Sequence, residues 1–423
     1  MSAEPPAPAE PSAPDDVPHD VPHGAPHDVP HGAPHDAPHG APHEAGGSSS
    51  EVAGGPPPGA VGGPPLAFEA APRPAPAMHW RTAVLLISAF SAVLLGSVLM
   101  LLPVPFVVLQ PGPALNTLGS EDGHPLISVS GHASYPAKGA LDLTTVTVSG
   151  GPGSRLLLVD ALRAWFDPTL TVAPEESVYP KGQSPASSRA QDQQDMVTSQ
   201  ESATVAALRE LGITVPSTLT VAEVDAGGPA TPLRAKDVIV ALGGQPVPDL
   251  AALTGRMRQV QRGATVAVTV QRDGVEKVLQ APTRGFVDGR PILGIRIAPT
   301  FHPPFQVTIR IDNVGGPSAG TMFALGIIDL LTPGDLTGNR QIAGTGTIDV
   351  DGSVGPIGGI RQKLNGARGA GAEWFLAPSE NCSEVVGHVP DGLHVVRIST
   401  LHDARQAVER IAAGRTDGLP GCG

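Results

Sequence analysis

The stretch AGTGTIDVDGSVGPIGGIRQK, residues 343–363, decides the fold when it is read together with NVGGPSAG, residues 313–320. NVGGPSAG follows the alternating strand pattern of residues 307–311 and leads into an apolar helical run that ends at Leu331. Ser318 is therefore expected at the N-terminal end of a helix, where unpaired backbone N–H groups and the helix dipole favour negative charge. That position suits a nucleophile whose substrate develops an oxyanion. Because serine also caps helices after Gly-Gly-Pro, NVGGPSAG alone favours a cap.

The longer stretch changes this interpretation. It contains a predicted hairpin turn at Asp351-Gly352 and ends at Lys363, and FLAPSENC follows at residues 375–382. In this order, the motifs resemble the proteolytic domain of Lon proteases over about residues 295–412. The resemblance implies a mixed α/β domain with a Ser-Lys dyad, in which Ser318 is the nucleophile and Lys363 the general base. It also implies three supporting residues, Thr345, Gly316 and Pro317.

A lysine accepts a proton near neutral pH only when burial lowers its pKa. The apolar neighbours Ile357, Ile360 and Leu364 make a buried position for Lys363 possible. A triad based on histidine is the weaker choice, because none of the downstream histidines has a matching Asp and Ser motif: His302, His388, His394 and His402.

Two positions depart from the Lon pattern. Gly315 stands where an acidic residue often precedes Gly-Pro-Ser-Ala-Gly, and Thr347 replaces a common glutamate. The chain also contains no Gly-x-x-x-x-Gly-Lys-(Ser/Thr) phosphate loop, so we expect activity without ATP and without a cofactor or metal. The resemblance also implies that the Lon-type domain assembles as a homo-hexamer, which the composition alone does not indicate.

A second resemblance covers residues 199–285, which include a preceding helix at 201–211. Strands are expected at 218–224, 237–242, 265–271 and 276–280, and a helix at 249–260. With Gly228-Pro229-Ala230 and Pro232-Leu233-Arg234, this pattern resembles a bacterial PDZ domain, which binds extended peptides by strand addition. The usual Lys/Arg-x-Gly-Asp is Arg234-Ala235-Lys236-Asp237 here. The nearest candidates for the carboxylate-binding loop are Leu211, Gly212 and Ile213; a spacer with an idle groove is the alternative.

Residues 82–102 contain no charged side chain, and their helical length roughly matches a hydrocarbon core of ~30 Å. They are apolar on all faces, which predicts a transmembrane helix and membrane lipid as a partner. About 80 residues precede them and no cleavage site follows, which indicates an uncleaved signal anchor. Arg73 and Arg81 lie at the start and the next basic residue is Lys138, so we expect a cytoplasmic N-terminus and extracytoplasmic C-terminal domains at the cell membrane.

The charge divides at the same place. Residues 1–81 hold ten acidic and two basic residues, so most of the net charge of −13 belongs to this tail. Its Pro-His repeats place a histidine every fourth residue from His19 to His43, and the low apolar content predicts disorder, with weak metal capture as an alternative. A strongly basic surface is absent elsewhere, which argues against nucleic acid.

Residues 103–198 are expected to form a separate membrane-proximal region rich in strands, at 126–129, 143–148 and 156–159, with a polar linker at 180–194 and no chemistry. Residues 413–423 form a C-terminal tail. An oxidising compartment would permit Cys382 and Cys422 to pair, and two free thiols are the alternative.

The sequence thus predicts an ATP-independent, membrane-anchored serine endopeptidase that acts on flexible or misfolded extracytoplasmic polypeptides presented by its PDZ domain. The alternative is a catalytically silent peptide-binding scaffold or chaperone on the same fold.

Overall fold

The computed structural model describes residues 79–121, 123–180, 182–225, 231–261, 263–287, 290–312 and 314–423. The histidine-rich tail, with its expected disorder and its alternative of metal capture, lies outside the described residues, as does the Gly-Pro-Ala motif at 228–230. The described elements combine helices with parallel and antiparallel strands, which confirms the mixed α/β class.

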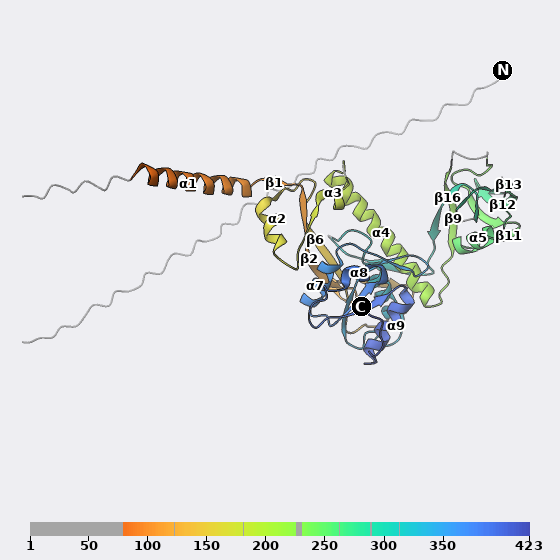
Figure 1. The fold of residues 1–423 in the computed structure, drawn as a ribbon. Coiled ribbons are helices and arrows are strands. Elements are labelled where there is room, and N and C mark those ends of the chain that lie inside the picture. Colours follow the sequence, from red (N-terminus) through yellow and green to blue (C-terminus); the bar gives the residue numbers. More distant parts are fainter. Residues whose placement is uncertain are drawn as a thin grey trace, which may run out of the picture. The chain divides into compact units, whose positions relative to one another are not determined.

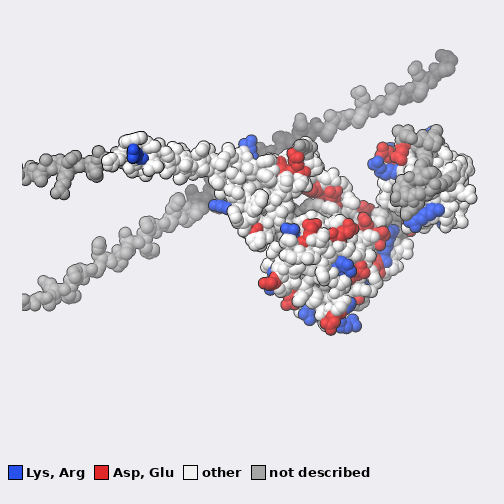
Figure 2. Space-filling view, viewed as in Figure 1, with Lys and Arg blue, Asp and Glu red and all other residues white. Residues whose placement is uncertain are grey.

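Helix α1 spans Trp80–Met100, two residues earlier than the predicted 82–102. Its mean hydropathy is 2.4 and none of its residues is buried in the protein. In Figure 2 its surface is uncharged apart from a basic group near its start. Among the described residues it is the one helix that is long and apolar enough to be a candidate membrane span.

One six-stranded sheet has the order β22-β21-β18-β6-β2-β8 and is called the large sheet below. Its strands β2 and β6 are labelled in Figure 1. Its four neighbours β22, β21, β18 and β6 run parallel, whereas β2 and β8 add antiparallel strands at one side. The strands are β2 (Phe106–Asn116), β6 (Ala140–Gly150), β8 (Thr171–Pro174), β18 (Gln341–Gly344), β21 (Trp374–Pro378) and β22 (His394–Ile398).

Helices cover both faces of this sheet, because the side chains along each strand point alternately to one face and to the other. On β6, Leu141 and Leu143 contribute to a core that also contains apolar residues of α4 (Pro185–Glu210), α6 (Gly320–Leu331) and α9 (Leu401–Ala412). On β18 and β21, Ala343 and Phe375 belong to a second core with α7 (Ile360–Gly369) and α8 (Cys382–Val385). The result is a three-layer domain in which α6 and α7 lie on opposite faces.

The expected separate region at residues 103–198 is wrong. Its strands β2 and β6 are central strands of the large sheet, and β6 pairs in parallel with β18, about 200 residues later in the chain. The strand expected at 156–159 is also shorter than predicted: β7 (Leu156–Leu157) pairs with β1 (Pro103–Val104), and α2 (Leu158–Trp165) follows directly. Sequence periodicity identified strands here but carried no information about their distant partners.

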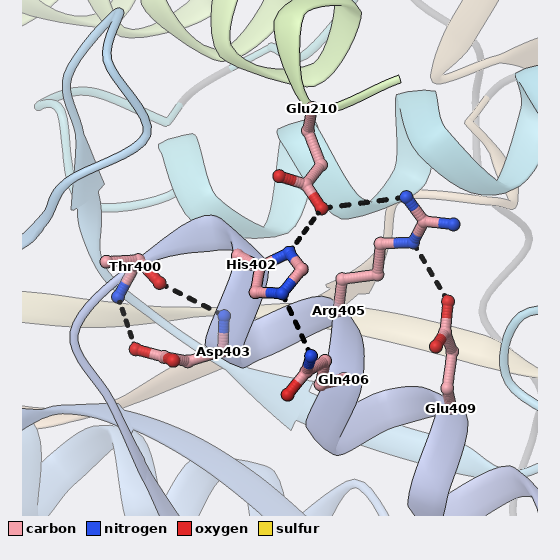
Figure 3. Close-up of polar contacts among 7 residues, drawn as sticks. All are labelled: Glu210, Thr400, His402, Asp403, Arg405, Gln406 and Glu409. Atoms are coloured by element: carbon pink, nitrogen blue, oxygen red, sulfur yellow. Dashed lines mark hydrogen bonds and ion pairs between the residues drawn. The ribbon is translucent and has the colours of Figure 1, made fainter. Parts of the chain in front are cut away.

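The expected linker at 180–194 is wrong as well, because α4 begins at Pro185. Ser184 caps it by accepting a hydrogen bond from the backbone N–H of Ser187. The buried residues of α4 lie mostly in its second half, so its polar first half gave no helical signal. At the end of α4, Glu210 accepts one hydrogen bond from His402 and forms an ion pair with Arg405 of α9 (Figure 3), which ties α4 to the three-layer domain.

A second sheet has the order β13-β12-β10-β9-β16, with β11 beside β10. Its elements are β9 (Ser217–Val224), β10 (Val238–Leu242), β11 (Gln245–Pro246), α5 (Leu250–Met257), β12 (Thr265–Arg272), β13 (Val275–Pro282) and β16 (Ile295–Phe301). Strands β9, β10, β12 and β13 and helix α5 lie where the PDZ pattern predicted them. β16 differs, because residues 295–301 were expected to open the Lon-type domain but pair with β9 instead.

Directly before β10 of this second sheet, Asp237 is buried and accepts hydrogen bonds from the Arg272 guanidinium at 2.6 and 2.7 Å. Burial alone would raise the pKa of Asp237, but these bonds and one from the Arg234 amide outweigh it and lower the pKa.

Short elements complete the described chain. They are β3 (Ser120–Glu121), β4 (His124–Pro125), β5 (Ile127–Ser130), α3 (Glu175–Val178), β14 (Arg284–Val287), β15 (Arg290–Ile292), β17 (Gln306–Ile309), β19 (Thr347–Ile348), β20 (Val354–Gly355) and the 3₁₀ turn Ser379–Asn381. The strand expected at 126–129 corresponds to β5, which pairs with β17.

Candidate active site

Ser318 and Lys363 come from segments on opposite faces of the large sheet, and their side chains meet. Ser318 lies two residues before the start of α6, and Lys363 lies in the first turn of α7. Lys363 Nζ is 2.8 Å from Ser318 Oγ, 2.9 Å from the carbonyl oxygen of Thr144 and 3.0 Å from Thr345 Oγ1. The structure therefore brings together Ser318, Lys363 and Thr345, which the Lon resemblance selected from separate motifs.

Lys363 is almost fully buried, with a relative exposure of 3%. Its neighbours Ile360 and Leu364 are completely buried in the core on the α7 side of the sheet. This burial penalises the charged form and lowers the pKa of Lys363 from 10.5 to about 7. A large fraction of the side chain is therefore neutral near physiological pH.

Backbone and side-chain hydrogen bonds fix the loop that carries Ser318. The Ser318 carbonyl oxygen accepts from the Gly346 amide at 2.9 Å and from Thr345 Oγ1 at 3.0 Å, and the Thr321 amide donates back to the Gly346 carbonyl. Gly346 has φ 151°, and a Cβ there would lie 2.6 Å from Thr321 Oγ1. Only glycine fits this position without a clash, so the Gly346 backbone can approach the nucleophile loop.

β6 contributes to the site a group that has no signal in the sequence. Thr144 binds Lys363 through its backbone carbonyl, which every residue type has, so no residue pattern could have identified it. β18 pairs with β6 only from Ala140 to Leu143, and over the rest of β6 the described chain supplies no strand on that side. Residues 143–148 instead line a cavity of 490 Å³ that also contains Ser318 and Lys363.

Gly315, one of the two departures from the Lon pattern, has a steric reason. A Cβ at Gly315 would lie 2.7 Å from Cβ of Asp192, and the Gly316 amide donates to the Asp192 carbonyl at 3.0 Å. Asp192 belongs to α4, within the stretch predicted to be a linker. Burial, and secondarily the charge of Asp195, raise the pKa of this carboxyl. An acidic group thus lies beside Gly315, although it comes from another part of the chain.

Two further supporting positions belong to the same loop. Gly316 has φ 82°, and Pro317 accepts a hydrogen bond from Ser199 of α4 at 3.0 Å through its carbonyl oxygen. Thr347 is the other position that departs from the Lon pattern, and its backbone carbonyl accepts a hydrogen bond from Thr321 Oγ1.

The three residues 211–213 do not form a carboxylate-binding loop. They end α4, and their backbone N–H groups donate to carbonyl oxygens of the helix, those of Ala207, Arg209 and Leu208 respectively. Leu211 and Ile213 also pack against the core of the three-layer domain. Their amides are therefore used within the helix cap and are not available to a peptide carboxylate.

A different groove lies in the second sheet. It has a volume of 430 Å³ and is formed by α5 together with residues 291–297, which include the start of β16. β16 is an edge strand, because it pairs only with β9 in this sheet. β16 follows the β12-β13 hairpin in the chain, whereas residues 211–213, the predicted carboxylate-binding loop, precede β9.

Two further sequence predictions concern the pairing of the two cysteines and the binding of a metal ion. Cys382 and Cys422 form a disulfide bond, which links α8 to the last residues of the chain. The described residues contain no group of three His, Cys, Asp or Glu side chains that is arranged to hold a metal ion.

Two protein-family models match parts of this chain. Residues 302–409 match the C-terminal proteolytic domain of Lon protease (S16), and residues 170–283 match the PDZ domain. The PDZ match begins earlier than the second sheet and includes α4, which packs in the three-layer domain.

Individual relatives match over the C-terminal region. Lon protease 1 of Bacillus subtilis (strain 168) is 32% identical over 114 residues, which cover 25% of this chain and 14% of the relative. Lon protease of Azospirillum brasilense is 35% identical over 114 residues, again 25% and 14%. Lon protease of Nitratidesulfovibrio vulgaris is 31% identical over 141 residues, 30% of this chain and 17% of the relative. The chain therefore spans less than a fifth of the length of these relatives. By these matches, residues 302–409 are similar to the proteolytic domain of Lon proteases, and residues 170–283 are similar to a PDZ domain.

Proposed function

We propose that this protein is a serine endopeptidase in which Ser318 is the nucleophile and Lys363 the general base. The observation that carries the proposal is the contact of 2.8 Å between Lys363 Nζ and Ser318 Oγ, made by a buried lysine whose pKa is lowered to about 7. The Lon-type family match and the curated relatives support the same chemistry.

The hydrogen bonds around Lys363 suit a neutral amine. A neutral amine has two N–H groups and one lone pair. The Thr144 carbonyl can only accept, and the Thr345 hydroxyl, which donates to the Ser318 carbonyl, can accept from Nζ as well. The two N–H groups are thereby used, and the lone pair faces the Ser318 hydroxyl. Lys363 can then take the proton from Ser318 as the serine oxygen attacks.

The reaction proceeds through an acyl-enzyme. Ser318 Oγ bonds to the carbonyl carbon of the scissile peptide, and its proton moves to Lys363 Nζ. Negative charge develops on the carbonyl oxygen close to the N-terminal end of α6, where the helix dipole favours it. Lys363 then protonates the leaving amine as the C–N bond breaks. A water molecule attacks the acyl-enzyme, again with Lys363 as base, and releases the acid product together with free Ser318.

The free side of β6 provides a place for an extended substrate. Residues 145–148 continue past the last residue paired with β18 and line the cavity that contains Ser318. A peptide added to this edge as a strand would satisfy the open backbone groups and would place its own carbonyls beside the nucleophile. This mode requires an extended chain, so flexible or misfolded polypeptides are the substrate class that we propose.

The PDZ domain supplies a second peptide site. Its groove between α5 and β16 is lined by apolar residues such as Leu253, Met257 and Ile297, next to the edge of β16. We propose that it binds a segment of the substrate by strand addition.

We further propose that the enzyme is anchored in the cell membrane by α1, with a cytoplasmic N-terminus and extracytoplasmic PDZ and proteolytic domains, and works without ATP. The length and hydropathy of α1, the basic residues at its start and the lack of a phosphate-loop motif in the sequence support this. A homo-hexamer of the Lon-type domain is part of the same proposal, by resemblance alone.

The test uses the full chain in detergent micelles and unfolded casein as substrate. We expect cleavage by the wild type and none by Ser318→Ala or Lys363→Ala, while all three bind a fluorescent casein peptide equally. Lys138→Ala, which removes an exposed lysine, is the matched control and should retain full activity. Equal casein turnover by wild type and Ser318→Ala would reject the proposal in favour of the silent scaffold.

A further inference from the structure

Helix α2 has its amphipathic character reversed. Its small residues Ala161 and Ala164 face inward, with exposures of 6% and 3%, and pack against Val108 of β2. Trp165 at its end and Phe166, which caps it, are 74% and 85% exposed. In a water-soluble domain the large apolar side chains would normally face the core.

Apolar residues on one side of α2 form a continuous surface. Leu158, Leu162 and Trp165 are spaced four and three residues apart, so they lie on one side of the helix, and Phe166 extends the same side. Leu158 is half-buried, and the other three are exposed. We call these four residues the α2 face. Two aromatic side chains that could each bury roughly 150–250 Å² make this face costly to leave in water.

The α2 face lies beside the end of the candidate span. The Leu158 amide donates to the carbonyl of Leu102 at 3.0 Å, and β1, which follows α1, pairs with the two residues that precede α2. The start of α2 is therefore held at the level where the apolar segment ends (Figure 1). Tryptophan and other amphipathic aromatics are enriched at this level of a membrane.

We propose that the α2 face inserts into the interfacial layer of the bilayer that α1 spans. This rests on the membrane anchoring proposed above. The charges nearby are balanced, since Arg155 and Arg163 are matched by Asp160 and Asp167. Partitioning of apolar area therefore carries the interaction, and a zwitterionic lipid surface is sufficient.

Such contact gives the enzyme a second attachment to the membrane. α2 packs on β2, and β2 is the neighbour of β6, which lines the cavity at Ser318. Attachment at α1 alone leaves the domain free to rotate about one connection. Attachment at the α2 face as well fixes the direction in which the active-site cavity opens relative to the lipid surface.

The experiment uses the full chain in phosphatidylcholine vesicles with or without brominated acyl chains, which quench tryptophan on contact. The chain has three tryptophans, so W80F/W374F leaves Trp165 alone and W165F/W374F leaves Trp80 alone. We expect brominated lipid to quench Trp165 as strongly as Trp80, and aqueous iodide to quench Trp165 far less in vesicles than in the unfolded chain.

The two variants separate this proposal from the anchoring on which it rests. Quenching of Trp80 but not of Trp165 would overturn the proposal and leave the span in place. If brominated lipid quenches neither Trp80 nor Trp165, both the insertion of the α2 face and the membrane anchoring by α1 are wrong. If Trp165 is untouched by brominated lipid but becomes protected from iodide as protein concentration rises, a second copy of the chain covers the α2 face and the proposal is wrong.

Discussion

The lowered pKa of Lys363 predicts a specific pH dependence of catalysis. The general base must be neutral, and with a pKa of about 7 about half of Lys363 is neutral at pH 7, against about 0.03% for a lysine of pKa 10.5. We expect kcat/KM for an uncharged peptide substrate to rise about tenfold between pH 6 and pH 8 and then to level off. The measurement is a set of initial rates with the full chain in detergent from pH 5 to pH 10.

Lys363→Arg is the control for this profile. Arginine keeps the length and positive charge of the side chain but does not lose its proton in this range, so the variant should be inactive at every pH. Lys138→Ala should reproduce the wild-type curve, since it removes an exposed lysine. A flat profile for the wild type, or a midpoint near pH 10, would refute the assignment of Lys363 as the base.

The same shift also affects stability. The folded pKa of Lys363 lies below its unfolded value, so between about pH 7 and 10.5 the unfolded chain binds a proton that the folded chain does not. The free energy of unfolding should therefore rise with pH across this window, by about 5 kcal/mol in total for this group, because each pKa unit is about 1.4 kcal/mol. Below pH 7 Lys363 is charged in both the folded and the unfolded chain, so the full cost of burying its charge lowers the free energy of unfolding. Urea unfolding of Lys363→Met, compared with wild type, should lack this rise.

Three further substitutions test separate parts of the structure. Thr345→Val keeps the shape of the side chain but removes the hydroxyl that bonds both Lys363 Nζ and the Ser318 carbonyl. A lost bond of about 1–1.5 kcal/mol should lower kcat about tenfold and leave KM unchanged. Equal kcat values for the variant and the wild type would contradict this. Gly346→Ala, forced into φ 151° and against Thr321, should lower stability by about 1–3 kcal/mol and abolish peptidase activity, as thermal unfolding and casein assays would show. Cys422→Ser opens a disulfide with a sequence separation of 40, which should reduce the free energy of unfolding by about 4 kcal/mol at most. An unchanged midpoint in urea would count against the bond.

The side chains of the site were predictable through the resemblance to Lon proteases. That resemblance rests on motifs that contain Ser318, Lys363 and Thr345, whereas NVGGPSAG alone favours a helix cap; the structure brings the three residues within hydrogen-bonding distance. The strands of the PDZ domain were predictable from the local sequence, since alternation and turn residues mark them.

Backbone groups and distant pairings were not predictable. Thr144 contributes a carbonyl that any residue would offer, and its strand finds β18 only after about 200 intervening residues. The first half of α4 is polar, so its approach to Gly315 through Asp192 has no local signal. Residues 211–213 were the predicted carboxylate-binding loop, yet all three amides are used to end α4.

These corrections together change the domain organisation. Strands β2 and β6 and helix α4 precede the PDZ sheet in the chain, whereas α6, β18 and α7 follow it, and both groups share one sheet and its two cores. We infer that the proteolytic domain is discontinuous and that the PDZ domain, closed by β16, is inserted into it. Residues 103–210 would then be needed for catalysis, because without β6 Lys363 loses a hydrogen-bond partner and the cavity at Ser318 loses one wall. The segment that seemed to connect a membrane helix to an enzyme is therefore part of the enzyme itself.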